Sequence, residues 1–149
     1  MKNLVSGADD TNNSLPNYEA NVVKLAPLGS DSPDSLVEAK GVCSVVIVSY
    51  KTGEVLMDCI RSVLRQSKLH QLILVDNGNT RQTIQQLNEI ADKNSKFEII
   101  TGHGNVGFSK GCNLGVRRAR GEYILLLNPD SILQVDTLIP ALELSLIHI

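Results

Sequence analysis

The chain has 149 residues, of which 42% are hydrophobic and 3% aromatic, and its formal net charge is −2 at pH 7. This composition fits one domain with a mainly aliphatic core. The charge gives no general attraction to polyanions, so a nucleic-acid groove or an anionic lipid surface is not favoured, and no apolar run is long enough to cross a membrane.

The three cysteines, Cys43, Cys59 and Cys112, form no CxxC pair and are odd in number. This spacing does not indicate a secreted disulfide framework, so we expect a reducing compartment. The amino-terminal residues are too polar for a signal peptide. We therefore predict a cytoplasmic protein, for which a peripheral position at the inner membrane face is also open.

Residues 1–40 are rich in Asn, Ser, Asp and Pro and hold one short apolar patch, Val22–Leu28. So little apolar surface cannot offset the entropy that is lost on ordering. We predict that residues 1–40 form a polar leader or linker that is largely disordered. The folded part is expected at residues 41–149.

From Cys43 onward, short apolar runs alternate with segments of helical periodicity. The run CSVVIVSY is β-branched and nearly continuous, which is typical of a strand buried on both faces of a parallel sheet. The expected strands cover residues 43–50, 71–76, 97–101 and 123–127, and the expected helices cover 55–66, 84–91 and 108–119. This order predicts an α/β fold with an open, mostly parallel sheet and helices on both faces.

Three of the expected strands end in noteworthy groups, Ser49-Tyr50, Asp76-Asn77 and Asn128-Pro129-Asp130. Parallel strands bring their carboxyl ends to one edge of the sheet, where open sheets bind ligands. We therefore predict that these groups share one cleft.

Asp76 supports two interpretations that the sequence leaves open. Its carboxylate can accept hydrogen bonds from a base N–H or from ribose hydroxyls at the sheet edge. Because Asp76 precedes Asn77-Gly78, the carboxylate can equally well satisfy backbone N–H groups of its own turn.

Gly107, Gly111 and Gly115 recur every fourth residue of an expected helix. Each glycine disfavours the helix by about 1 kcal/mol relative to alanine, so a close approach of the backbone should compensate. We favour an anionic ligand near the helix start for Gly107 and packing on the sheet for Gly115.

Asp130 follows a buried strand and a stiffening proline. A carboxylate there suits Mg²⁺ or Mn²⁺, which keeps several waters and shares diphosphate oxygens. The alternative is a helix N-cap, with Asn-Pro-Asp-Ser leading into a following helix. From spacing alone the N-cap is at least as well supported.

Other common sites are not indicated. The histidines show no metal-ligand spacing with the cysteines, and His103, between two glycines, is interpreted as a loop residue. The sequence has no GxxxxGK[ST] phosphate loop and no GxGxxG directly after the first strand, which argues against an ATPase and a dinucleotide enzyme.

Three blocks in their order and spacing resemble the amino-terminal half of a family 2 glycosyltransferase with the GT-A (Rossmann-like) fold, rhamnosyltransferase-like members most of all. The blocks are SVVIVSYKTGEVLMDCIRSVLRQS, LILVDNGNT and NVGFSKGCNLGVRRARGEYILLLNPDS, within residues 42–133. The resemblance implies inverting transfer from a nucleotide-diphosphate sugar to a saccharide or lipid-linked acceptor in polysaccharide biosynthesis. It also implies a divalent cation, Mg or Mn, as cofactor.

The resemblance implies roles for individual residues as well. Ser49 and Tyr50 would lie against the base, and Asp76 would bond to it. Asp130 would be the metal-binding aspartate of the DxD-type motif, in which Asn128 replaces a carboxylate by a neutral amide. The implied donor-binding residues are Ser49, Tyr50, Asp76, Asn105, Gly107, Gly111, Asn113 and Asn128.

The family takes its catalytic base, an Asp or Glu, from a segment well after the metal motif. Asp136 and Glu143, in an expected helix after the motif, do not match that base, so we expect it beyond Ile149. The chain is thus interpreted as a truncated donor-binding part that is inactive alone. A non-catalytic nucleotide-sugar-binding fragment or interaction module remains the alternative.

Overall fold

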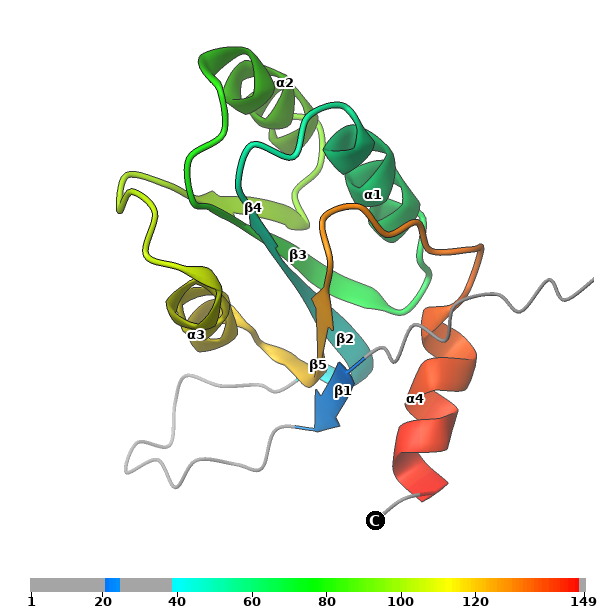
Figure 1. Cartoon of the computed structure of the whole chain (residues 1–149). Helices are drawn as coiled ribbons and strands as arrows, with labels where there is room; N and C mark the ends of the chain where they lie inside the picture. Colours follow the sequence, from blue (N-terminus) through cyan, green and yellow to red (C-terminus); the bar gives the residue numbers. More distant parts are fainter. Residues whose placement is uncertain (1–20, 25–38, 148–149) are drawn as a thin grey trace, which may run out of the picture.

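The computed structural model describes residues 21–24 and 39–147, and the rest of the predicted leader lies outside the described residues. Figure 1 shows the elements, which are β1 (Asn21–Lys24), β2 (Ala39–Ser49), α1 (Val55–Leu64), β3 (Leu69–Asp76), α2 (Arg81–Ala91), β4 (Phe97–Ile100), α3 (Phe108–Arg118), β5 (Gly121–Leu127) and α4 (Leu138–Ile147). The strands and helices expected between residues 43 and 127 are all present. Their observed ends differ slightly from the expected ones.

The strands form one five-stranded sheet in the order β1-β5-β2-β3-β4. Strands β2 to β5 are parallel, and β1 pairs antiparallel with β5 at the edge. From β2 the chain steps to β3 and β4 on one side, and β5 then returns to the other side of β2. The predicted open, mostly parallel sheet is confirmed.

The sequence predicts no strand at β1, which lies inside the expected leader. Its four residues pair with Tyr123 to Leu126 of β5. Backbone hydrogen bonds to an otherwise open sheet edge stabilise a short strand that has little apolar surface of its own. For that reason, the short apolar patch at Val22–Leu28 does not by itself indicate a strand.

Helices cover both faces of the sheet, as predicted. Alternate residues of a strand point to opposite faces, which explains the nearly continuous apolar run of β2. On one face the helices α1, α2 and α4 bury a core that includes Val45, Ile47, Leu56, Ile60, Leu72, Leu74, Leu87 and Leu138. On the other face α3 packs through Cys112 and Val116 against Val46, Val48, Ile73 and Val75.

Helix α3 approaches β2 closely because two of its glycines face the sheet. A Cβ atom built on Gly111 would lie 2.8 Å from Cγ1 of Val48, and one built on Gly115 would collide with Val46. The expected packing role of Gly115 is confirmed, and Gly111 packs in the same way. This contact sets the rotation of α3 and places its start beside the end of β3.

Candidate functional site

The carboxyl ends of β2, β3 and β5 lie at one edge of the sheet (Figure 1). Ser49 pairs in register with Asp76 of β3, and Ile47 pairs with Leu127 of β5. The chain leaves β2 on one side toward β3 and later returns on the other side as β5. Such a topological switch point separates the following loops, and open α/β sheets commonly bind ligands at this position.

Asp76 is only 8% exposed, and its carboxylate organises the turn that follows β3. Its Oδ1 accepts hydrogen bonds from the backbone N–H groups of Gly78 (3.0 Å) and Asn79 (2.8 Å) and from Nδ2 of Asn79 (2.8 Å). Its Oδ2 accepts only a longer bond, 3.3 Å, from the Thr101 hydroxyl. The turn interpretation of Asp76 is confirmed, and Oδ2 is the oxygen with capacity for a ligand.

Asn79 joins the ends of β2 and β3, a role that the sequence does not predict. Its Nδ2 donates to the buried hydroxyl of Ser49 at 2.6 Å. The backbone N–H of Asn77 donates to the Ser49 carbonyl at 2.9 Å. Ser49 is therefore held inside the edge by its neighbours. The available clue is the repeated Asn in DNGN, which on its own indicates only a turn.

Tyr50 stands at the edge with 51% of its surface exposed. Gly78 lies under the ring, since a Cβ built on it would approach Cε2 of Tyr50 to 3.3 Å. The ammonium of Lys51 is 5.2 Å from the ring centroid. An exposed aromatic face beside the Asp76 turn is suited to stacking against a flat ring.

The buried Asn77 connects β3 to the start of α3. Its Nδ2 donates to the Gly107 carbonyl at 3.0 Å, and its Oδ1 lies 3.2 Å from Nε2 of His103. Because this amide donates through nitrogen to a carbonyl, its oxygen must be the acceptor, and His103 carries a proton on Nε2. His103, interpreted from sequence as a loop residue, is thus a contact of the edge, and its buried Nδ1 has no partner within the described residues.

The start of α3 is shaped by Asn105 and Gly107. Gly107 has φ +83°, which favours glycine, and its N–H donates to Oδ1 of Asn105 at 3.0 Å. The first N–H groups of a helix have no partner within it and favour a nearby anion. The backbone conformation explains Gly107 without a ligand, while the anion remains a prediction.

Asn113 lies apart from these residues. It is exposed, and it follows the sheet-facing Gly111 by two residues, which places it on the opposite side of α3. The structure therefore brings the other predicted donor-binding residues to the sheet edge or to the sheet-facing side of α3, but not the side chain of Asn113.

Residues 128–137, which we call the post-β5 segment, form neither helix nor strand. The next helix, α4, begins only at Leu138, so the N-cap interpretation of Asp130 is wrong. Asp136, which was expected within that helix, precedes it. Asn128 and Asp130 are exposed, and the Asp130 carboxylate makes no hydrogen bond or ion pair within the described part of the chain.

Cys59 of α1 lies close to Asp130 but does not add a metal ligand. Burial, and after it the negative charge of Asp130, raises the pKa of this thiol to about 12, so it stays protonated at neutral pH. Residues 21–24 and 39–147 contain no group of three or more His, Cys, Asp or Glu side chains placed to hold a metal. A hard cation at Asp130 would have to take its other ligands from phosphate oxygens and water.

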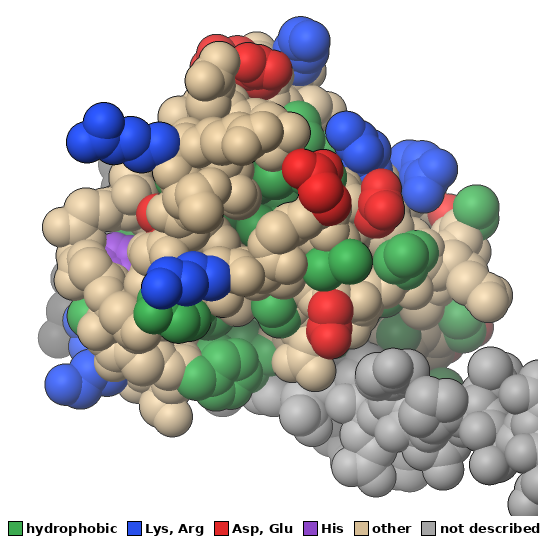
Figure 2. Space-filling view, turned by 45° about the horizontal axis from the view of Figure 1, so that its top comes forward, with side chains coloured by type: hydrophobic (Ala, Val, Ile, Leu, Met, Phe, Trp, Pro, Cys, Tyr) green, Lys and Arg blue, Asp and Glu red, His purple; other side chains and the backbone are tan. Residues whose placement is uncertain are grey.

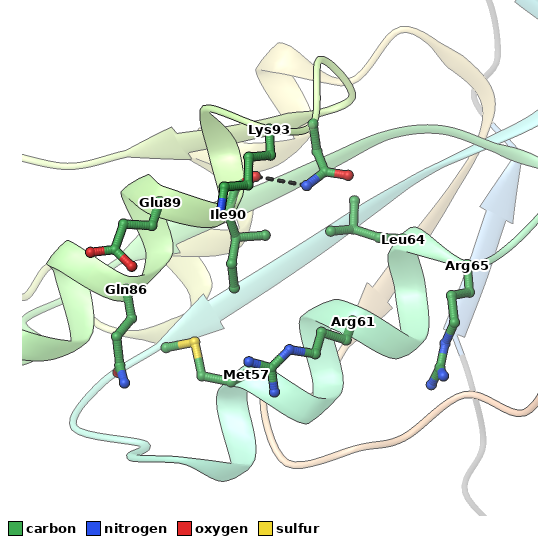
Figure 3. Close-up of a pocket in the computed structure, with 9 residues that line it drawn as sticks. Met57, Arg61, Leu64, Arg65, Gln86, Glu89, Ile90 and Lys93 are labelled. Carbon is green, nitrogen blue, oxygen red and sulfur yellow. Dashed lines mark hydrogen bonds between the residues drawn. The ribbon is translucent and has the colours of Figure 1, made fainter.

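The described residues also form a surface groove away from this edge. A groove of about 630 Å³ lies between α1 and α2, where Ile90 points toward Met57 (Figure 3), and no predicted site residue lines it. On the face shown in Figure 2, acidic and basic side chains are interspersed. No helix in the described part of the chain has the length and apolar character that a bilayer crossing requires.

Comparison with known proteins identifies the same region. The model of glycosyl transferase family 2 matches residues 44–145, which include all three strand ends. The glycosyltransferase GlyG of Streptococcus pneumoniae is 28% identical over 92 residues, which are 61% of this chain and 31% of that protein. The chain spans about a third of the length of the first curated relatives it matches.

Solved structures confirm the predicted GT-A fold. The S. aureus protein TarS in complex with UDP matches 72% of this chain and 32% of its own, with a TM-score of 0.61 and 22% identity. The mannosyltransferase PcManGT from Pyrobaculum calidifontis, in complex with GDP-Man and Mn²⁺, matches 71% of this chain and 33% of its own, with a TM-score of 0.57 and 14% identity.

Proposed function

Because the chain belongs to glycosyl transferase family 2, we propose that it supplies the donor-binding part of an inverting glycosyltransferase. The donor is a nucleotide-diphosphate sugar, and the acceptor is a saccharide or a lipid-linked saccharide of polysaccharide biosynthesis. The observation that carries this proposal is the exposed carboxylate of Asp130, which has no partner among the described residues, on the same sheet edge as Tyr50 and Asp76.

The nucleoside is proposed to lie at the ends of β2 and β3. The exposed ring of Tyr50 offers a stacking face for the base, and Oδ2 of Asp76 has capacity to accept a base N–H. The hydrogen bond between Asn79 and Ser49 joins the strand ends that carry Tyr50 and Asp76. Bases that present an N–H at the Asp76 edge are therefore preferred.

The diphosphate is proposed to lie between the start of α3 and the post-β5 segment. Gly107 begins the helix there, and Asp130 would hold Mg²⁺ or Mn²⁺ together with the diphosphate oxygens. A bound divalent cation would neutralise the charge that develops on the leaving diphosphate. The presence of Mn²⁺ with GDP-Man in the PcManGT complex supports this assignment.

Inverting transfer also needs a base that deprotonates the acceptor hydroxyl. Asp136 is engaged by the Ser67 hydroxyl at 2.9 Å, and Glu143 lies exposed on α4. Neither is assigned that role, so the described residues account for binding and orientation of the donor. We place the enzyme in the cytoplasm, which the three free, buried cysteines support.

Calorimetric titration with UDP and with GDP, each with and without Mn²⁺, tests the proposal. We expect binding of at least one nucleotide that Mn²⁺ strengthens about tenfold, within the usual range of coupling between two ligands. Asp130→Ala should abolish the Mn²⁺ effect, whereas Asp92→Ala, an exposed acid at the end of α2, should leave it unchanged. Binding that ignores Asp130 would remove the metal assignment.

A second candidate is a non-catalytic nucleotide-sugar-binding module, favoured by the lack of an assigned base among the described residues. Turnover by the 149-residue chain in a sugar-transfer assay would exclude the module. The rhamnosyltransferase-like branch is the proposed subgroup on the strength of Asn128-Pro129-Asp130. Tighter binding of a nucleotide-diphosphate rhamnose than of UDP-GlcNAc would support it.

A further inference from the structure

Helix α1 and the residue that follows its C-cap turn a buried polar stripe toward the post-β5 segment. The stripe consists of Cys59 and Ser62, three residues apart on one side of α1, and Gln66, which lies two residues beyond the end of the helix. All three are almost fully buried, with relative exposures of 0%, 1% and 3%. Buried polar side chains are retained in proteins where they satisfy specific partners.

The partners of this stripe lie about seventy residues later in the chain. Nε2 of Gln66 donates to the Gln134 carbonyl at 2.7 Å, and its Oε1 accepts from the Leu138 N–H at 3.2 Å. The Ser62 hydroxyl accepts from the Leu133 N–H at 3.0 Å. Gln66 and Ser62 therefore contact both ends of the stretch from Leu133 to Leu138.

Cys59 adds a weaker contact at the beginning of the segment. Its thiol lies 3.6 Å from the Asn128 carbonyl, within reach of a weak S–H donor. Asp130 thus lies between a point held by Cys59 and a point held by Ser62. Its carboxylate has no partner among the residues that the structure describes, but its backbone is fixed from both sides by α1.

The segment has few hydrogen bonds of its own. Among its backbone groups, the N–H of Ser131 donates to the Asn128 carbonyl at 3.2 Å and that of Thr137 to the Gln134 carbonyl at 3.3 Å. Buried backbone groups without partners are strongly disfavoured. The contacts from α1 therefore select the path of this segment.

We propose that Ser62 and Gln66 are positioning residues for the metal and diphosphate, because they set the place of Asp130 relative to the ends of β2 and β3. This inference rests on the proposed function of Asp130 as the cation ligand. Ser62 of α1 and Gln66, just after that helix, would thus contribute to ligand binding, although both lie far from Asp130 in sequence.

Gln71 provides a matched control elsewhere in the fold. Its Oε1 accepts from the Arg120 N–H at 2.7 Å and from the Ser44 hydroxyl at 3.1 Å, and its Nε2 donates to the Arg118 carbonyl at 3.1 Å. It is the same residue type as Gln66 and makes as many polar contacts. However, it fastens the turn between α3 and β5, at the amino ends of the strands.

The experiment measures the dissociation constant of UDP, and of GDP in parallel, with and without Mn²⁺ for the 149-residue chain. For each nucleotide, we define the Mn²⁺ factor as the dissociation constant without Mn²⁺ divided by the dissociation constant with Mn²⁺. We expect Gln66→Met to reduce this factor about fivefold or more and Ser62→Ala to reduce it by a smaller amount, within the usual size of coupling between sites. Gln71→Met and Ser62→Thr, which keeps the hydroxyl, should retain the wild-type factor.

The outcomes separate the inference from the proposed function. If Asp130→Ala abolishes the Mn²⁺ factor but Gln66→Met and Ser62→Ala keep it at the level of Gln71→Met, the positioning role is wrong and the metal assignment stands. If the wild-type chain shows no Mn²⁺ factor, both are wrong. Circular dichroism checks that each variant is folded. If Gln66→Met unfolds the chain, the Mn²⁺ factor of Ser62→Ala, which removes only one oxygen atom, tests the positioning role instead.

Discussion

The turn after β3 and the segment after β5 lie at the same edge of the sheet, yet they are built in opposite ways. In the turn at residues 76–79, Oδ1 of Asp76 receives three hydrogen bonds from residues at most three positions away. In the post-β5 segment, the Asp130 carboxylate receives none within the described residues, and the backbone is held by Ser62 of α1 and by Gln66, which follows that helix. The Asp76 carboxylate mainly maintains structure and keeps only Oδ2 for a ligand, whereas both oxygens of Asp130 are open to one.

The two acids at this sheet edge therefore have different main roles. A carboxylate that accepts hydrogen bonds from backbone N–H groups through one oxygen destabilises the fold when it is removed, and it has only its other oxygen for a ligand. An exposed carboxylate contributes little to folding and can bind a cation without first losing a partner. Stability measurements and binding measurements should therefore rank Asp76 and Asp130 in opposite orders.

The largest expected effect on stability is that of Asp76→Ala. Removal of the carboxylate leaves the N–H groups of Gly78 and Asn79 without their acceptor, so the free energy of unfolding should fall by about 2–3 kcal/mol. Asp130→Ala should change it by no more than about 0.5 kcal/mol. Urea denaturation checks both values, and Asp76→Asn, which keeps one side-chain oxygen, should recover part of the loss. Equal losses for the two alanine variants would contradict the comparison.

A smaller effect is expected from Gly78→Ala, which tests whether the turn also supports the Tyr50 ring. Gly78 has φ +127°, a conformation that side chains rarely adopt, and the added methyl group would press on Tyr50. We expect a loss of about 1–3 kcal/mol in the free energy of unfolding, from backbone strain alone or with the ring contact. Gly53→Ala, at φ +77° with no atom within 4 Å, is the control for strain without contact. If the loss at Gly78 is no larger than at Gly53, the turn does not support the ring.

The two regions also differ in what the sequence could predict. The turn at residues 76–79 follows from local rules, because Asp before Asn-Gly satisfies its own backbone, and the sequence alone supports this interpretation of Asp76. The place of Asp130 depends on where α4 begins, and that depends on the bond from Leu138 to Gln66. No local pattern contains this contact, so spacing leaves the metal ligand and the N-cap unresolved.

The same limit explains the other differences between expectation and structure. The strands β2 to β5 and the helices α1 to α3 were predictable because apolar periodicity reports burial directly. Strand β1 was not, since it is held by backbone pairing with β5. Ser62 and Gln66 resemble ordinary polar positions of an amphipathic helix, and only the fold shows that they are buried. The outward direction of Asn113, by contrast, follows from the glycine face of α3 and was within reach of the sequence.

The smallest expected effect concerns the Cys59 thiol beneath the post-β5 segment. Its pKa is about 12 in the folded chain, against an ordinary value of 9.0. The contribution of this thiol to the free energy of unfolding is therefore constant well below pH 9 and falls above pH 9, because the unfolded chain loses its thiol proton there. One such thiol lowers the free energy of unfolding by about 1.4 kcal/mol at pH 10. Urea denaturation from pH 8 to pH 10 should therefore show a shallower decline for Cys59→Ala than for the wild-type chain.

Asp130→Asn separates the two causes of the raised pKa of Cys59. Burial is the main cause of the raised pKa of Cys59, and the charge of Asp130 comes second. Removal of that charge should leave the decline close to that of the wild-type chain. A decline as shallow as that of Cys59→Ala would mean that the Asp130 carboxylate, and not burial, keeps the thiol protonated. Such close coupling requires a carboxylate that is shielded from water, and a shielded carboxylate would not be open to a hydrated cation and a diphosphate.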